Sequence, residues 1–428
     1  MQRPANRSLD FAALCGFVTL FPVFLAYHYM VASKWIAPVL GGLFGPASLL
    51  LALVALVYLA TSFVRPPANV YPIEWAFLWF ALYLLLWTAG ATAMRLDTSY
   101  VEAAATESGA TLSIWLACFF IGARAPFTGI GAKKLLMACG VLTLLILAHA
   151  MWARRSLVGP FLMFHGETGL GQTDSNASST YQSIGRSILV IAIALAATRQ
   201  KFSHQLAVLA AGIGALLATG SRGHLFTCIL LLASLTGLML LRRRNRIVGT
   251  AFLVVLLVAA EPLMSVLMET RAGEIFDLSE STSWQARQRA QSRAVDVVMQ
   301  NPFLGDFGYH HSGTTGYAHN ILSAWTQFGA VAFMAFLAML LYALFLSAQR
   351  AVLRERCSPL WRLAFMMNMS ALILALASES ILASVFPALG WGCTVQALRD
   401  ERASGNTFAI ALQAVVRARL RPTAGLQE

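Results

Sequence analysis

The chain has 428 residues, of which 58% are hydrophobic and only 12% are charged. A soluble domain is typically about 25% charged, so a water-soluble fold has too few polar side chains to cover this much apolar surface. Apolar stretches of about 20 residues, the length that crosses a hydrocarbon core, recur along the whole chain and are too long for barrel strands. The composition therefore excludes a soluble protein and predicts an all-α, polytopic integral membrane protein.

These stretches predict about twelve transmembrane helices in a single transmembrane domain, residues 1–428. Arg3 and Arg7 precede the first stretch without a small-residue cleavage signature, so we expect that stretch to be retained as a span. The expected spans cover residues 9–31, 36–63, 71–93, 103–123, 135–152, 180–198, 205–220, 223–241, 247–267, 321–348, 363–378 and 380–398.

The net charge of +12 is explained by the linkers between spans and does not indicate nucleic-acid binding. Most of the 31 basic residues fall in linkers on the side of the N-terminus. Because cytoplasmic loops carry an excess of Lys and Arg, this asymmetry predicts that both termini are cytoplasmic and that residues 399–428 form a short cytoplasmic tail. The six cysteines predict neither a disulfide framework nor redox chemistry, and no cofactor is expected.

The longest linker on the outer side covers residues 261–318, between the ninth and tenth expected spans. Structureless linkers of this length are unusual in compact proteins and are often functional. The stretch that begins at Trp284 is rich in helix formers and carries Arg287, Arg289 and Arg293, so we expect short helices in this loop. A glycine- and hydroxyl-rich stretch follows and delivers His319 to the start of the tenth span.

A second polar group, Ser221-Arg222-Gly223, lies at the turn between the seventh and eighth expected spans, also on the outer side. An arginine at a membrane boundary is either an anchor that reaches toward lipid headgroups or a receptor for phosphate. The guanidinium matches phosphate geometry and stays charged, and backbone N–H groups at a following helix start would add to the attraction. Both interpretations remain open from these residues alone.

Three signals together resemble the O-antigen ligase and polymerase family of bacterial surface-polysaccharide enzymes. They are SRG at 221–223, Arg287 ahead of NPFLGDFG at 301–308, and AHNILSAWTQFG at 318–329. Their order, side and spacing are similar to that family over roughly residues 206–344, and upstream of this region only the topology is similar.

The resemblance implies a metal-independent, inverting glycosyltransferase of the bacterial inner membrane whose active site faces the periplasm. Its donor would be a glycan linked to undecaprenyl diphosphate, and its acceptor a hydroxyl of another glycan or of lipid A-core. His319 is then the catalytic general base, and Arg222 and Arg287 bind the donor diphosphate. The residues expected to support them are Ser221, Asn320, Arg289, Arg293, His311 and Glu379.

Other interpretations remain for several of these residues and for the function. His319 has a plain alternative as a helix cap, and His310 and His311 as solvent-facing side chains; the adjacent pair lacks zinc-site spacing, so no metal is predicted. An Arg-x10-Gly pattern from Arg155 to Gly166 slightly favours a polymerase of repeat units over a ligase. A secondary transporter or an O-linked protein glycosyltransferase are further alternatives.

Overall fold

A computed structural model describes residues 7–32, 35–36, 44–63, 71–94, 99–154, 175–219, 221–241, 247, 249–251, 254, 282–311, 318–352, 357–382 and 384–419. Within these ranges every named element is a helix. The helices are α1 (Arg7–Val18), the π-helical turn η1 (Thr19–Val23), α2 (Phe24–Ala32), α3 (Phe44–Phe63), α4 (Pro72–Met94), α5 (Ser99–Arg124), α6 (Ile130–Arg154), α7 (Ser175–Ala197), α8 (Phe202–Thr219), α9 (Arg222–Leu241), α11 (Thr282–Gln300), the 3-10 turn η5 (Tyr309–His311), α12 (Leu322–Val352), α13 (Pro359–Ala377) and α14 (Phe386–Arg419).

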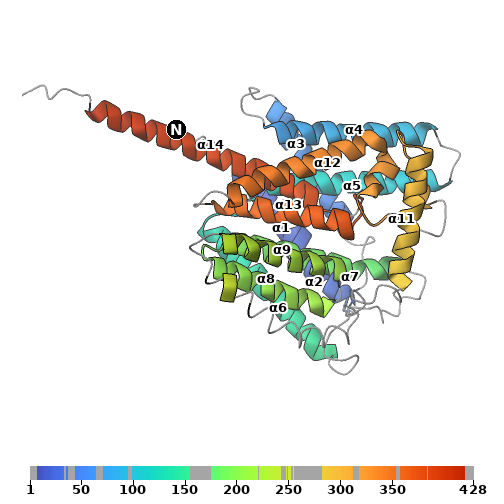
Figure 1. The fold of residues 1–428 in the computed structure, drawn as a ribbon, viewed down its shortest axis with the longest axis horizontal. Coiled ribbons are helices and arrows are strands. Elements are labelled where there is room, and N and C mark those ends of the chain that lie inside the picture. Colours follow the sequence, from blue (N-terminus) through green and yellow to red (C-terminus); the bar gives the residue numbers. More distant parts are fainter. Residues whose placement is uncertain are drawn as a thin grey trace, which may run out of the picture.

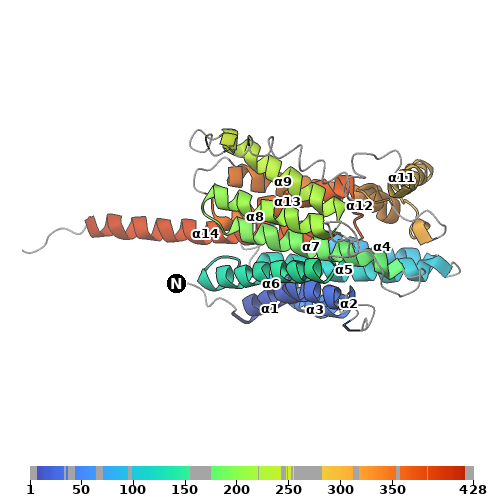
Figure 2. The same ribbon diagram turned by 90° about the horizontal axis from the view of Figure 1, so that it is seen from below.

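Most of these helices run side by side in one bundle, and two elements mark its ends. α11 lies across one end, and the C-terminal part of α14 extends beyond the other (Figure 1). We name these ends the α11 end and the α14 end. Figure 2 shows α1, α2 and α3 as the layer on one side of the bundle and α9 on the opposite side. The fold therefore confirms the all-helical, membrane-type architecture expected from the sequence.

Seven helices in the described part of the chain are long and apolar enough to cross a membrane, which indicates a multi-pass membrane protein. The expected number of about twelve is not confirmed. Three further apolar helices are shorter, and the ninth expected span, residues 247–267, lies almost wholly outside the described residues. The seven are Ser8–Val31, Pro72–Met94, Tyr100–Arg124, Ile130–His149, Phe202–Thr219, Leu322–Ala351 and Pro359–Ala377.

The helix boundaries follow local chemistry. Pro359 stands in the first turn of α13, where its missing N–H costs nothing, and Ser358 caps that helix by accepting from the N–H of Trp361. α12 is kinked at Gly329, which has a φ of 79° and a ψ of 177°. Glycine adopts this conformation without the strain that a side chain would cause. At the other terminus α14 continues without a break through Arg399 to Arg419, so the expected tail begins as an extension of the last helix.

Ion pairs gather at the α14 end. Arg124 on α5 lies 2.7 Å from Asp10 on α1, and Arg350 on α12 lies 2.8 Å from Glu401 on α14. Arg399 on α14 pairs with the buried Glu74 of α4. All three arginines belong to the set that the charge asymmetry assigns to the cytoplasm. The fold thus brings them to one end of the bundle, and the orientation of that end stays a prediction.

Aromatic side chains from four helices fill the centre of the bundle. Trp115 of α5 lies with its ring centroid 5.7 Å from Phe80 of α4, 5.8 Å from Phe336 of α12 and 5.6 Å from Trp391 of α14. All four side chains are buried. Stacked and edge-on rings at these separations are stabilising beyond the area that they bury. This cluster fixes the helices whose α11-side ends carry the polar residues described below.

α5 and α14 approach each other through two glycines. A Cβ atom on Gly122 would lie 2.8 Å from the backbone N of Cys393, and one on Gly392 would lie 2.8 Å from the backbone N of Ala123. Both distances are shorter than real Cβ contacts, and the neighbouring atoms belong to helix backbone that cannot move aside alone. Small residues at a helix crossing are the usual device for close packing inside membranes.

We therefore expect Gly122→Ala to destabilise the bundle by about 1–3 kcal/mol, the usual cost of overpacking. Gly109 lies on the same helix with open space around it and is the matched control. Gly109→Ala should be neutral, or stabilising by up to about 1 kcal/mol through helix propensity. The measurement is the thermal unfolding midpoint of the full-length protein in detergent micelles. Equal midpoints for the two variants would contradict this description of the α5–α14 crossing.

Candidate functional site

The turn that carries Ser221-Arg222-Gly223 is held against α7 on one side. Ser221 is buried, and its Oγ lies 2.8 Å from Nδ1 of His224 in the first turn of α9. A Cβ atom on Gly185 of α7 would lie 2.5 Å from the Cβ of Ser221. Only glycine at position 185 allows this approach. Ser221, expected to support phosphate binding, is thus committed to His224 and to packing against α7.

The other side of the same turn contacts the chain between α13 and α14. We call this chain the 378–385 segment, and the structure describes all of it except residue 383. A Cβ atom on Gly223 would lie 2.5 Å from Oγ of Ser378. Arg222 therefore stands between two close contacts that fix its backbone, and its side chain is half-buried. The glycine next to this arginine has a packing role whatever the arginine binds.

A buried ion pair joins α9 to the 378–385 segment. Nε2 of His224 lies 3.0 Å from Oε1 of Glu379, and both side chains are buried. Burial by itself raises the pKa of Glu379, but His224 and, more weakly, Arg186 of α7 outweigh it and hold that pKa below its ordinary value. Glu379 is therefore a carboxylate at neutral pH. Its partner and its low pKa favour an anchoring role over that of a general base.

Several polar atoms around this ion pair are buried without a hydrogen-bond partner among the described residues. They include Oγ of Ser378, Ser380 and Ser384, Oε2 of Glu379, Nε2 of His224 and Nε of Arg186. Buried polar groups nearly always have a partner, because desolvating one without compensation is costly. The unpartnered atoms of α7, α9 and the 378–385 segment thus match a polar region completed by water or by a bound polar group.

The two remaining motifs form one structural unit. The backbone N–H of Asp306 donates to the carbonyl of Thr326 at 2.7 Å, and the N–H of Ala330 donates to the carbonyl of Phe303 at 3.0 Å. Gly305, with a φ of 65°, allows the approach, since a Cβ there would lie 2.5 Å from the carbonyl oxygen of Thr326. NPFLGDFG is therefore clamped along the first turns of α12, which position His319 just before that helix.

His319 lies near Arg287 of α11. Burial, and to a smaller extent the positive charge of Arg287, lowers the pKa of His319 from 6.5 to about 4. The imidazole is neutral at pH 7 and can accept a proton, but it is a weaker base than a free histidine.

The other predicted residues of this region have separate positions. Asn320 accepts from the N–H of Leu322 through Oδ1 at 3.0 Å and so caps the start of α12. Arg289 is exposed, and Arg293 lies close enough to Tyr309 for its positive charge to act on the tyrosine hydroxyl. Arg287 is thus the loop arginine for which the structure gives an interaction with His319.

One hydrogen bond connects the region of His319 to the polar cluster around Glu379. The N–H of Ile381 in the 378–385 segment donates to Oγ of Ser323 on α12 at 2.8 Å. The same segment carries Glu379, and Glu379 pairs with His224 two residues after Arg222. The 378–385 segment therefore connects the three sequence signals, although they come from α9, α11 and α12.

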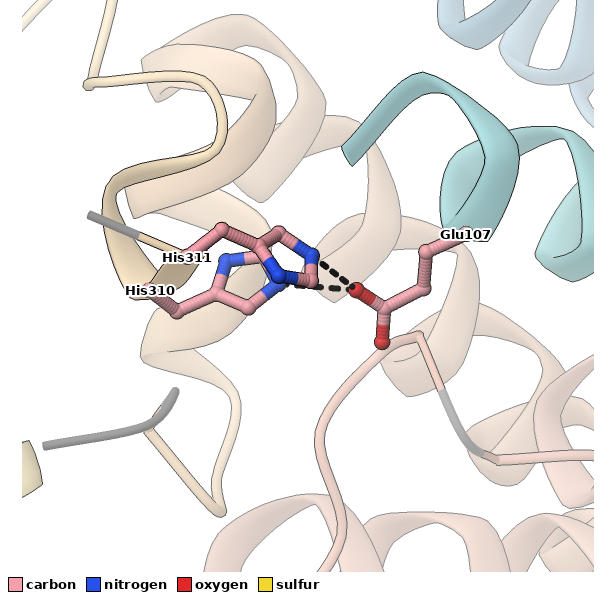
Figure 3. A group of neighbouring side chains, drawn as sticks. All are labelled: Glu107, His310 and His311. Atoms are coloured by element: carbon pink, nitrogen blue, oxygen red, sulfur yellow. Dashed lines mark hydrogen bonds and ion pairs between the residues drawn. The ribbon is translucent and has the colours of Figure 1, made fainter. Parts of the chain in front are cut away.

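His311 belongs to a different cluster. Nε2 of His311 lies 3.2 Å, and Nε2 of His310 2.7 Å, from Oε2 of Glu107 on α5 (Figure 3). The interpretation of both histidines as solvent-facing is wrong for His310, which is buried. Sequence reasoning missed Glu107 because it precedes His310 by 203 residues, and no local spacing pattern indicates the contact.

Arg186 and His224 were also missed as site residues. Arg186 is the charged residue of α7 and stands just before the apolar half of that helix. This is a usable signal, because ionisable residues inside spans are commonly functional. The Arg155 to Gly166 pattern lies outside the described residues.

Comparison with known proteins adds no family assignment. No model of a known protein family matches the chain, and no curated protein matches it.

The buried contact between His224 and Glu379 leads to a prediction about stability. We expect Glu379→Gln to lower the free energy of unfolding by about 1–3 kcal/mol, because a buried polar partner is left unsatisfied. His224→Ala combined with it should cost less than the sum of the single changes. Glu102→Gln, an exposed acid on α5, is the control. Denaturant unfolding in micelles measures all four variants, and strictly additive losses would contradict a direct His224–Glu379 interaction.

Proposed function

We propose that the α11 end binds a glycan linked to undecaprenyl diphosphate and transfers that glycan to an acceptor hydroxyl at the periplasmic face of the bacterial inner membrane. Among the activities that share this donor, the polymerisation of repeat units of a surface polysaccharide is preferred. The observation that carries the proposal is the meeting of Arg222 and the His319–Arg287 neighbours at one end of the bundle, connected by the 378–385 segment.

The arginines supply the electrostatics of this reaction. A diphosphate leaving group carries negative charge that grows as its bond to the sugar breaks. Guanidinium groups bind phosphate oxygens through two parallel hydrogen bonds and remain charged at any relevant pH. Arg222, with its backbone fixed by Ser221 and Gly223, is the best-positioned donor contact, and Arg287 lies beside the proposed base. Arg186 adds positive charge near Glu379 on the same side.

His319 supplies the proton transfer. In the proposed step the imidazole takes the proton of the acceptor hydroxyl, and the oxygen forms a bond to the anomeric carbon from the face opposite the phosphate. The bond between that carbon and the phosphate oxygen breaks, and its electron pair stays on the polyprenyl diphosphate. The negative donor would also offset the charge of Arg287 and raise the pKa of His319, so the base becomes stronger when the donor is bound.

A ligase that transfers the finished glycan to lipid A-core is the alternative within the same chemistry, since the donor half of the site is shared. A secondary transporter fits less well. Transporter sites commonly lie near the middle of the membrane at the interface of repeated halves, whereas the polar cluster here lies at the end of the bundle.

The proposal predicts that two variants will separate binding from turnover. Arg222→Lys keeps the charge but loses the planar fork, so donor affinity should fall by roughly 10- to 100-fold, the value of a charged hydrogen bond. His319→Gln keeps a hydrogen-bonding side chain without basicity, so donor affinity should persist while turnover falls by roughly 100- to 10,000-fold. Donor binding and product formation are measured on purified, reconstituted protein.

Arg199→Lys, the same exchange at the α14 end, is the matched control and should change neither quantity. Wild-type affinity and turnover in Arg222→Lys would remove Arg222 from the donor site. Near wild-type turnover in His319→Gln would make His319 an orienting residue. The acid limb of kcat/KM offers a second check, because a free-enzyme pKa of about 4 places that limb well below the 6.5 of an ordinary histidine.

A further inference from the structure

Glu107, His310 and His311 form a compact group outside the proposed transfer site. Glu107 lies on α5, and the two histidines form most of the 3-10 turn η5. Figure 3 shows both imidazole rings directed at one carboxylate oxygen of Glu107. One possible ligand atom from each of the three residues lies within 4.8 Å of the other two.

We propose that Glu107, His310 and His311 bind a divalent transition-metal ion of the Zn²⁺ class. Two imidazole nitrogens and one carboxylate oxygen are a typical ligand set for zinc, and softer or purely oxygen-bound ions fit it less well. The side chain of His310 is 4% exposed, whereas those of Glu107 and His311 are each 31% exposed. The exposed part of Glu107 and His311 lets water reach the group as a fourth ligand.

The fold holds the three ligands in place from both directions. Gly308 has a φ of 81°, and a Cβ there would lie 3.0 Å from the Cβ of Ala104, one turn before Glu107 on α5. The turn that presents the histidines is thus pressed onto α5. The chain that precedes it is clamped to α12 through Asp306. A bound ion would therefore link α5 to the chain that Asp306 holds against α12 at the α11 end.

Gln327 of α12 controls which nitrogen of His310 carries a proton. The N–H of Gly308 donates to Oε1 of Gln327 at 3.0 Å, so Nε2 of Gln327 faces Nδ1 of His310, at 2.5 Å, as a donor. In the metal-free protein the proton of His310 accordingly lies on Nε2 and points to Glu107.

Metal binding needs the opposite tautomer. The ion takes the lone pair of Nε2, the proton moves to Nδ1, and the amide of Gln327 must turn its oxygen toward that proton. Gln327 therefore weakens the site. A carboxylate at position 327 would accept from both Gly308 and His310, as carboxylates do behind many zinc-bound histidines.

The test uses the purified full-length protein in detergent with Zn²⁺ or Co²⁺ as the added ion. We expect about one ion per chain, a higher unfolding midpoint with zinc, and a visible Co²⁺ spectrum of a low-coordinate nitrogen–oxygen site. His311→Ala should lose these responses. Gln327→Glu should bind zinc about tenfold more tightly or better.

His204→Ala, which removes an exposed histidine of α8, is the matched control and should bind zinc as the wild type does. Glu107→Gln is a second variant that keeps a hydrogen-bond acceptor while removing the charged ligand. Equal zinc affinity in wild type and in both ligand variants overturns the proposal. Unchanged affinity in Gln327→Glu overturns the assignment of His310 as a ligand.

Discussion

The arrangement at the α11 end depends on the 378–385 segment, a non-helical stretch of backbone buried among helices. The N–H groups of Ser378 and Glu379 donate to the carbonyl of Leu374, and that of Ile381 donates to Ser323. The carbonyls of Leu382 and Ser384 accept from Thr111 and from the indole of Trp115 on α5. These hydrogen bonds therefore form only when α5 and α12 lie at one fixed position along the segment.

The same segment carries the ion pair that fixes the start of α9. Because Glu379 binds His224 and Ser378 packs on Gly223, the position of Arg222 follows from the requirements of the 378–385 segment. Gly305 of the NPFLGDFG stretch has a similar packing role against α12, and Gly308 has one against α5. Much of each sequence signal thus builds the scaffold, and the residues left to act on a substrate are the arginines and His319.

The sequence predicted those features that depend on residues close together in the chain. Apolar stretches predicted most described helices to within about five residues, but the helix expected at 36–63 is Phe44–Phe63 and the one expected at 380–398 is Phe386–Arg419. The helix expected after Trp284 is α11. The placement of the kink at Gly329 and the partners of Glu379 were not predictable, because both depend on contacts between residues that are far apart in the chain. The lowered pKa of His319 likewise arises from burial and from Arg287, which the sequence places 32 positions away with no indication of proximity.

The same limit explains the cluster around Glu107. Spacing rules detect ligands that lie near one another along the chain, and they rejected His310 and His311 because no third ligand follows them. The third candidate comes from α5, which packs against this chain where Gly308 meets Ala104. Helix α5 therefore supports both polar regions of the α11 end, through Thr111 and Trp115 in one and Glu107 in the other.

The central claim is that the α11 end catalyses glycan transfer from a lipid diphosphate, and the most direct measurement is of the leaving group. Purified protein in proteoliposomes is given an undecaprenyl-diphosphate-linked glycan and a matching acceptor glycan, and the released undecaprenyl diphosphate is counted against the new glycosidic bonds. The account predicts release that requires the acceptor and equals the bonds formed. Movement of intact lipid-linked glycan across the bilayer with no release would contradict it.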